Sequence, residues 1–268
     1  MSSTVDTRWD AATFGAVARA VASGKGRMDD PFAEPLVRAA GEKRFVGLIN
    51  DERFAADEGA NPVTGGLVDI VAAHTTFVDG FLADAGRAGV RQVVILGAGL
   101  DARAYRLWWP RGSTVYELDR PEVLDFKAGV LRGLGATLTV SRCAIGVDLR
   151  RDWPAALLRS GFDRAAPTAW VAEQLLVGHL PADAQHRLLT GVTRLSAAGS
   201  RFAADHMPGL APGHPDADSV PGQLRGQRWE VVERNVVDLL TVMGLRELWG
   251  GGSDDAALVP RYVTAAMR

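Results

Sequence analysis

The sequence predicts an α/β protein in which a largely parallel sheet, covered by helices on both faces, follows an N-terminal cap made of helices. Residues 1–90 show helical periodicity and no convincing strand, whereas after residue 90 short apolar runs alternate with helical segments. The predicted strands are continuously apolar, which is typical of strands buried on both faces of a parallel sheet. We therefore divide the chain into a helical cap, 1–90, and a sheet core, 91–268.

Size, charge and cysteine content exclude several classes of protein. The 268 residues are 47% hydrophobic, enough for one large core, and 30 basic against 32 acidic residues give a net charge of −2. A chain with this balance has no excess of positive charge of the kind that nucleic-acid binding needs. Cys143 is the only cysteine, which excludes intramolecular disulfides and favours a reducing compartment. Since no signal peptide or membrane-length apolar run is present, we expect a cytoplasmic protein with neither nucleic-acid nor membrane partners.

Three helices are expected in the cap. The first has apolar residues at helical spacing from Ala11 to Val21 and ends at Gly24. A short helix begins at Asp30-Pro31. A longer one runs from about residue 64 to residue 86.

Strands and helices then alternate in the core. Strands are expected at 92–96, 113–118, 137–141, 168–172 and 200–205, and helices near 121–133, 153–160 and 181–197. Residues 229–232 and 261–265 are expected to close the sheet as a strand pair, with a helix at 236–243 between them. The stretch 208–226 contains four prolines and four glycines, so we expect a loop that acts as a lid.

A glycine turn follows the first strand. Gly97-Ala98-Gly99 comes directly after the apolar run 93–96, and the next strand ends in Asp119. Small residues let a ligand approach the backbone, and a carboxylate about twenty residues further on can bind ribose hydroxyls. The pattern therefore favours a nucleoside-binding site over an ordinary tight turn.

The same pattern formally satisfies the dinucleotide fingerprint, G-x-G-x-x-[GA]. Two features argue against NAD. The fingerprint strand normally opens its domain, but here a helical cap precedes it, and no second mononucleotide-binding half follows. An NAD-dependent oxidoreductase is thus the weakest of the enzyme classes considered.

Longer strings resemble the class I S-adenosylmethionine-dependent methyltransferases. They are VVILGAGLDARAYRL, VYELDRPEVLDFK, the pair Asp148-Leu149 and PTAWVAEQLL. The branch they resemble contains the leucine carboxyl methyltransferases, the polyketide carboxyl O-methyltransferases and many actinobacterial relatives. The resemblance covers most of 9–205 and also 261–264. It implies a seven-stranded, Rossmann-like methyltransferase sheet whose last strand is antiparallel, with S-adenosylmethionine as the cofactor.

The resemblance also implies a role for each polar residue that follows a strand. The turn glycines would approach the methionine part of the donor, and Asp119 would hold the ribose. Asp148 and Leu149 would flank the adenine. Glu173 would face the charged amino-acid end, and an acidic site suits a sulfonium with an ammonium group. The alternatives are helix capping by either aspartate and a solvated Glu173.

One departure concerns the carboxylate of the donor. Relatives carry an arginine in a stretch that reads Arg-Thr-x-Phe-Phe-Asp, where this chain has His74. An imidazole offers at most one donor and is mostly neutral near pH 7, so the exchange would weaken donor binding by ~1.5–3 kcal/mol unless Arg19, Lys25 or Arg27 substitutes. The alternative is that His74 simply packs in the core.

A second departure follows the fourth predicted strand. Relatives tend to read Glu-Gly-Leu-Leu, with a tyrosine before Leu-Pro, where this chain has Gln174 after the glutamate and His179 before Leu-Pro. The segment between the fifth and sixth strands is also short and proline-rich. These changes leave the fold prediction intact but bear on donor affinity and on methyl transfer itself.

The chemistry depends on the acceptor. A carboxylate is already ionised at pH 7, whereas a phenol or alcohol needs a general base, for which His179 and His206 are the candidates. No metal-binding motif is present. We expect an O-methyltransferase that acts on a carboxyl or hydroxyl group of a small molecule of natural-product type. The alternative is a methyltransferase-fold protein that catalyses a non-methylating step, such as a cyclisation, elimination or rearrangement, or binds a pathway partner.

Overall fold

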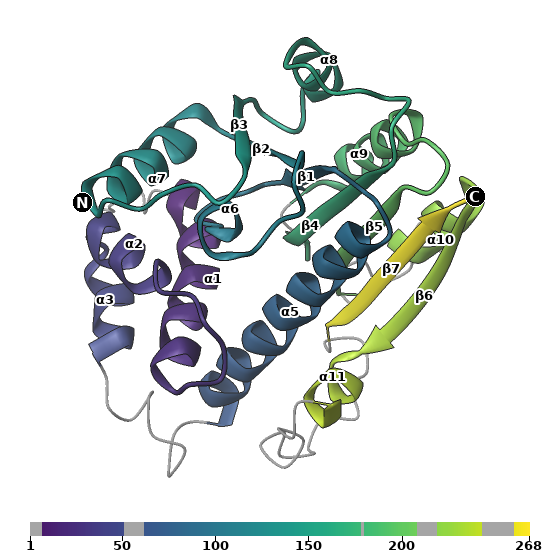
Figure 1. Ribbon diagram of the computed structural model, residues 1–268. Helices are drawn as coiled ribbons and strands as arrows, with labels where there is room; N and C mark the ends of the chain where they lie inside the picture. Colours follow the sequence, from purple (N-terminus) through teal and green to yellow (C-terminus); the bar gives the residue numbers. More distant parts are fainter. Residues whose placement is uncertain (1–6, 51–61, 178–179, 208–218, 243–259) are drawn as a thin grey trace.

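The structure, a computed structural model, describes residues 7–50, 62–177, 180–207, 219–242 and 260–268. Seven strands form one sheet in the order β3-β2-β1-β4-β5-β7-β6, as Figure 1 shows. β7 pairs antiparallel with both β5 and β6, and the other neighbours that pair are parallel. The prediction of a seven-stranded sheet with an antiparallel last strand is therefore confirmed. The strands are β1 Gln92–Leu96, β2 Thr114–Asp119, β3 Ser141–Gly146, β4 Thr168–Leu176, β5 Arg201–His206, β6 Trp229–Asn235 and β7 Arg261–Met267.

Helices connect the strands and build the cap. In the cap and before the first strand they are α1 Thr7–Gly24, α2 Ala33–Ala40, α3 Lys43–Asn50 and α5 Pro62–Arg87. In the core they are α6 Arg103–Arg106, α7 Pro121–Gly133, α8 Trp153–Arg159, α9 Ala182–Arg194, α10 Val220–Gly226 and α11 Val236–Val242. All the helices expected above are thus present, and α3 and α10 were not predicted.

The sheet is the middle of three layers because its strands are apolar on both sides. Val93 and Ile95 of β1 face one layer, where they pack with residues of α5 and α7. Val94 and Leu96 face the other layer, which α8, α9 and α10 supply. This alternation along one strand buries both faces of the sheet, as its continuous apolar runs predicted.

The helices within residues 1–90 have two kinds of partner, one another and the sheet. Helices α1, α2 and α3 pack against one another and share an apolar cluster with Leu131 of α7. Helix α5, the last helix of the predicted cap, also covers the sheet through Val78, Leu82 and Ala85. Helix α5 thus has apolar residues for two partners, the sheet along its second half and α1 along its first.

Two further predictions need correction. The third strand is Ser141–Gly146 and not 137–141, since it pairs in register with β2 from Thr114 to Asp119. It is an edge strand with a partly exposed face, so its own sequence is less apolar than the segment before it. Within the predicted 208–226 loop, residues 220–226 form helix α10, which Ser219 caps by accepting a hydrogen bond from the Gly222 amide at 3.1 Å. Residues 208–218 lie outside the described part of the chain.

Candidate functional site

The glycine turn lies at the carboxyl end of β1 and has backbone geometry that favours glycine. Gly97 and Gly99 have φ angles of +68° and +41°, in the left-handed region. The amides of Gly97 and Ala98 both donate to the Leu118 carbonyl, at 2.9 and 3.1 Å, so the turn is fastened to the end of β2. A Cβ on Gly97 would lie 3.2 Å from a methyl carbon of Leu175, which leaves little room for a side chain.

Asp119, the last residue of β2, holds the other side of this turn. Its Oδ2 accepts a hydrogen bond from the Gly99 amide at 2.7 Å, and its Oδ1 accepts one from the Arg120 amide at 2.7 Å. Each carboxylate oxygen keeps a second lone pair, so the side chain can still accept from two hydroxyl groups of a ligand. The structure therefore brings Asp119 and the glycine turn together, as the sequence predicted.

The turn, Asp119 and the ends of β3 and β4 surround one cavity of about 450 Å³. This volume lies within the range of small-molecule and cofactor sites. Gly15 and Arg19 of α1 close the cavity on the side of the cap. Of the residues predicted to bind a cofactor, the cavity is lined by Gly97, Gly99, Asp119, Asp148, Leu149 and Glu173.

Asp148 and Leu149 follow β3 and line the cavity together. The Asp148 carboxylate accepts hydrogen bonds from the Arg150 guanidinium at 2.7 and 2.9 Å and from the Arg150 amide at 2.9 Å. These bonds lower the pKa of Asp148 to about 2, so it is ionised at neutral pH. A carboxylate beside the half-buried side chain of Leu149 suits a flat, apolar ring that carries an amino group.

Glu173 lies on β4 at the opposite end of the cavity. Its Oε2 is 2.5 Å from Nη1 of Arg103, and its Oε1 accepts from the Thr75 hydroxyl at 3.2 Å. Burial by itself would raise the pKa of Glu173, but the charge of Arg103 outweighs it, so the pKa lies well below its usual value. Glu173 is therefore a buried carboxylate, and the solvated alternative is wrong.

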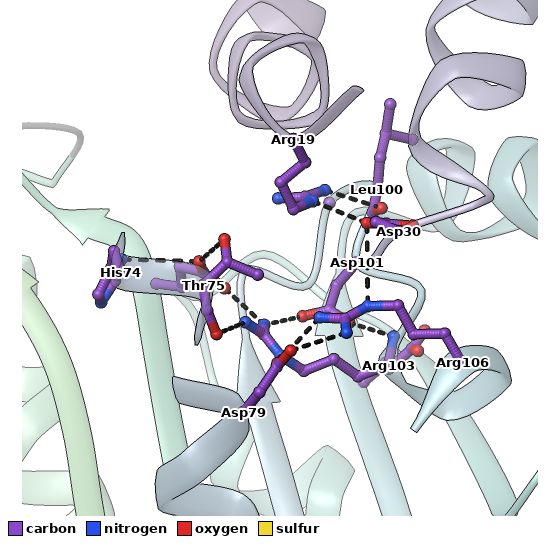
Figure 2. A network of polar contacts seen from close by, with 12 residues as sticks. Arg19, Asp30, His74, Thr75, Asp79, Leu100, Asp101, Arg103 and Arg106 are labelled. Carbon is purple, nitrogen blue, oxygen red and sulfur yellow. Dashed lines mark hydrogen bonds and ion pairs between the residues drawn. The ribbon is translucent and has the colours of Figure 1, made fainter. Parts of the chain in front are cut away.

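Arg103 is the centre of a buried ion network that the sequence did not reveal (Figure 2). It is 1% exposed, and besides Glu173 it contacts Asp79 at 2.7 Å and Asp101 at 2.5 Å. Burial would lower its pKa, but these carboxylates raise it well above the ordinary value. The network joins α5, the glycine turn, α6 and β4, and so it fixes Glu173 relative to the turn. Its sequence signal, an arginine between two alanines four residues after Gly99, is weak.

His74 lies beside Glu173 but is not among the residues that line the cavity. It is 2% exposed, its Nδ1 lies 3.5 Å from Glu173 Oε1 and 3.8 Å from Asp205 Oδ2, and its ring stacks on Tyr262 at 4.7 Å between centroids. The structure thus supports the packing alternative, because His74 reaches the cavity only through Glu173.

Neither candidate general base is among the described residues that line the cavity. His179 lies outside the described residues. His206, at the end of β5, is 5% exposed, does not line the cavity, and has its Nε2 4.0 Å from Glu233 Oε2. Burial lowers the pKa of His206 to about 4, which leaves it neutral at pH 7.

Arg19 is the predicted substitute cation that the structure brings to the cavity. Its Nε donates to Asp30 at 3.0 Å and its Nη2 to the Leu100 carbonyl at 3.1 Å. Figure 2 shows these two partners on one side of the guanidinium. Arg27 is paired with Asp69 instead, and neither Arg27 nor Lys25 lines this cavity.

Two features of the described residues bear on possible membrane and metal partners. None of the helices described is long and apolar enough to cross a membrane. Across the same ranges, no group of three or more histidine, cysteine, aspartate or glutamate side chains has the arrangement that could hold a metal ion.

Comparison with known proteins identifies the family. The profile of the leucine carboxyl methyltransferase family matches residues 12–193. A relative from Mycolicibacterium paratuberculosis (strain ATCC BAA-968 / K-10), named "Putative S-adenosyl-L-methionine-dependent methyltransferase", is 54% identical over 95% of this chain and 96% of its own length. A relative of the same name from Mycobacterium avium (strain 104) is 53% identical over the same shares.

Among solved structures, magnesium protoporphyrin IX methyltransferase from Synechocystis PCC 6803 is 16% identical, with a TM-score of 0.48 over 88% of this chain and 99% of its own. That likeness is distant, whereas the family profile and the relatives cover most of the sequence. The chain belongs to the leucine carboxyl methyltransferase family of S-adenosylmethionine-dependent methyltransferases.

Proposed function

We propose that this enzyme transfers a methyl group from S-adenosylmethionine to an oxygen of a small molecule, with a carboxylate as the favoured acceptor. The observation that carries the proposal is the single cavity that joins the glycine turn, Asp119, Asp148-Leu149 and Glu173. Each feature suits one part of the donor, and together they span it from adenine to amino acid.

The residues of the cavity fit this donor. Asp148 accepts from the adenine amine while Leu149 packs on the ring. Asp119 accepts from the ribose hydroxyls through the lone pairs that the Gly99 and Arg120 amides leave free. Gly97, which has no side chain, lets the donor approach the backbone.

The amino-acid end of the donor meets two opposite charges. Glu173 faces the ammonium group, and its orientation is held by Arg103 and Thr75. Arg19, on the cap side of the same cavity, supplies a cation for the carboxylate. This placement compensates for His74, which lies where relatives have an arginine, and it favours methyl transfer over the non-methylating alternative.

The bound donor supplies an electrophilic methyl group, which an in-line displacement transfers as the carbon–sulfur bond breaks and its electron pair passes to sulfur. The protein contributes alignment and the exclusion of water. Among the described residues that line the cavity there is no histidine to act as a general base. This favours an acceptor oxygen that is already ionised, and the family description names a carboxyl methyltransferase.

Calorimetric titration with S-adenosylhomocysteine tests donor binding, and absence of binding at millimolar ligand would overturn the proposal. The acceptor class is tested with radiolabelled donor and paired substrates, one a carboxylic acid and the other a phenol of similar size. A methyl ester releases volatile labelled methanol in base, whereas a methyl ether does not. Label that resists base would assign the hydroxyl alternative, and His179→Ala should then abolish transfer.

A further inference from the structure

Gln174 has a backbone conformation that a side chain rarely adopts. Its φ angle is +54°, and among the described residues only Arg228 shares a positive φ without being glycine. The pairing of β4 with β5 shifts register between Ala172 and Leu176. The backbone N–H of Gln174 donates to Asp205 Oδ1 at 2.6 Å. Strained backbone of this kind clusters at functional sites, so the reason for a glutamine here is expected in its side chain.

The side chain of Gln174 reaches across the cavity to the cap. A Cβ on Gly15 of α1 would lie 2.5 Å from Gln174 Oε1 and 3.0 Å from Nε2, so the amide packs directly on the glycine. Arg19 follows Gly15 by four residues and lies on the same face of the helix. Gln174, Gly15 and Arg19 all line the cavity, and the chain neighbour of Gln174 is Glu173. The amide is therefore placed beside the guanidinium at the amino-acid end of the site.

Both side chains have hydrogen-bond donors to spare. Nε2 of Gln174 is buried and has no hydrogen-bond partner. Arg19 uses Nε and Nη2 for Asp30 and Leu100, and within the described residues its Nη1 makes no hydrogen bond. A buried amide donor without an acceptor is unfavourable, so the group that completes this corner of the cavity is expected to bring acceptor oxygens.

We propose that the side-chain amide of Gln174 donates a hydrogen bond, next to Arg19, to the carboxylate of the methyl donor. A carboxylate accepts from a guanidinium and an amide at once, and the ammonium on the same carbon then faces Glu173. The inference rests on the donor placement proposed above. It assigns to Gln174 part of the contact that an arginine at position 74 would make.

The test compares two ligands that differ only in this carboxylate. S-adenosylhomocysteine carries it, and decarboxylated S-adenosylhomocysteine keeps the ammonium, the sulfur and the nucleoside. Gln174→Gly removes the amide and suits the backbone, so the variant is expected to fold. It should weaken S-adenosylhomocysteine ~10- to 100-fold in calorimetry, the range for a hydrogen bond to a charged group, and change the decarboxylated ligand less than ~2-fold.

Two further variants separate the amide from other effects. Gln174→Glu keeps the size of the side chain but puts a negative charge beside the carboxylate, so it should weaken S-adenosylhomocysteine more than Gln174→Gly does. Arg228→Gly relieves a positive φ of the same kind at an exposed position away from the cavity and should alter neither affinity. A Gln174→Glu variant that binds as well as the native protein would overturn the donor role of the amide.

The outcomes distinguish this inference from the proposed function. If the native protein binds neither ligand, both fail. If the native protein binds S-adenosylhomocysteine and Gln174→Gly shifts both ligands equally or neither, only the inference fails. In that case, a raised KM for a carboxylate acceptor in Gln174→Gly would assign the amide to the acceptor in place of the donor.

Discussion

Replacement of Arg103 by methionine should destabilise the protein strongly, because it leaves the carboxylates of Asp101 and Glu173 without the arginine that pairs with both. Arg103 is 1% exposed and contacts Asp79, Asp101 and Glu173 at 2.5–2.7 Å. Removing one partner of a buried ion pair costs about 3–5 kcal/mol of the free energy of unfolding. For a protein of this size that corresponds to a fall in Tm of roughly 6–20 °C.

Thermal unfolding followed by circular dichroism measures this effect, and Arg187→Met is the matched control. Arg187 pairs with Asp183 at 2.6 Å on the exposed surface of α9, with side chains 59% and 68% exposed. Exposed pairs of this kind contribute about 0–1 kcal/mol, so the control should shift Tm by only a few degrees.

The pH dependence of the Arg103→Met variant adds a second readout. In the native protein Arg103 lowers the pKa of Glu173, so the pair contributes stability above the ordinary pKa of Glu and loses it as the pH falls below that value. Without Arg103, burial raises the pKa of the Glu173 carboxyl, so the folded state binds more protons than the unfolded state and stability falls as the pH rises. The variant should therefore be more destabilised at pH 8 than at pH 5. Equal Tm values for the two arginine variants at pH 8 would refute the reasoning.

Three further outcomes are expected. Asp119→Ala should weaken S-adenosylhomocysteine at least ~100-fold in calorimetry, because two hydrogen bonds to a charged acceptor are lost; an unchanged affinity would remove the ribose contact. Gly97→Ala should lower the affinity for S-adenosylhomocysteine, because the new methyl group takes up space at the cavity. Gly135→Ala, at φ +69° with open space around it, should show the same backbone strain but leave this affinity unchanged. His206 has a pKa of about 4 in the folded state, so below about pH 6.5 the unfolded state binds more protons and stability falls. His206→Leu should therefore reduce the loss of unfolding free energy between pH 7.5 and pH 5 by about 2 kcal/mol in urea titrations, and identical losses would contradict the buried, neutral imidazole.

The strands and the glycine turn were predictable because their signals are local. An apolar run followed by two glycines specifies a strand and a left-handed turn within a few residues of sequence. The positions of Asp119, Asp148 and Glu173 at one edge then follow from the parallel order of the strands. The third strand was misplaced because an edge strand need not be apolar on both faces.

Roles that depend on distant partners were not predictable. Two of the three carboxylate partners of Arg103 lie 24 residues before it and 70 residues after it, so no local pattern marks it as the centre of a network. Sequence likewise could not show that His74 and His206 do not line the cavity, because the direction of a side chain depends on the register of packing. Gln174 was recognised as a departure from the family, but its backbone conformation depends on a register shift between two strands.

The position of β7 also has a consequence for biosynthesis. Although β7 is the last strand along the sequence, it lies inside the sheet, hydrogen-bonded to β5 on one edge and β6 on the other. On the ribosome, β6 is made about 25 residues before its partner, and until then the edge of β5 stays open to pairing with other chains. Completion of the sheet must therefore await residues 261–267, and nascent chains that stall before them would be prone to aggregate.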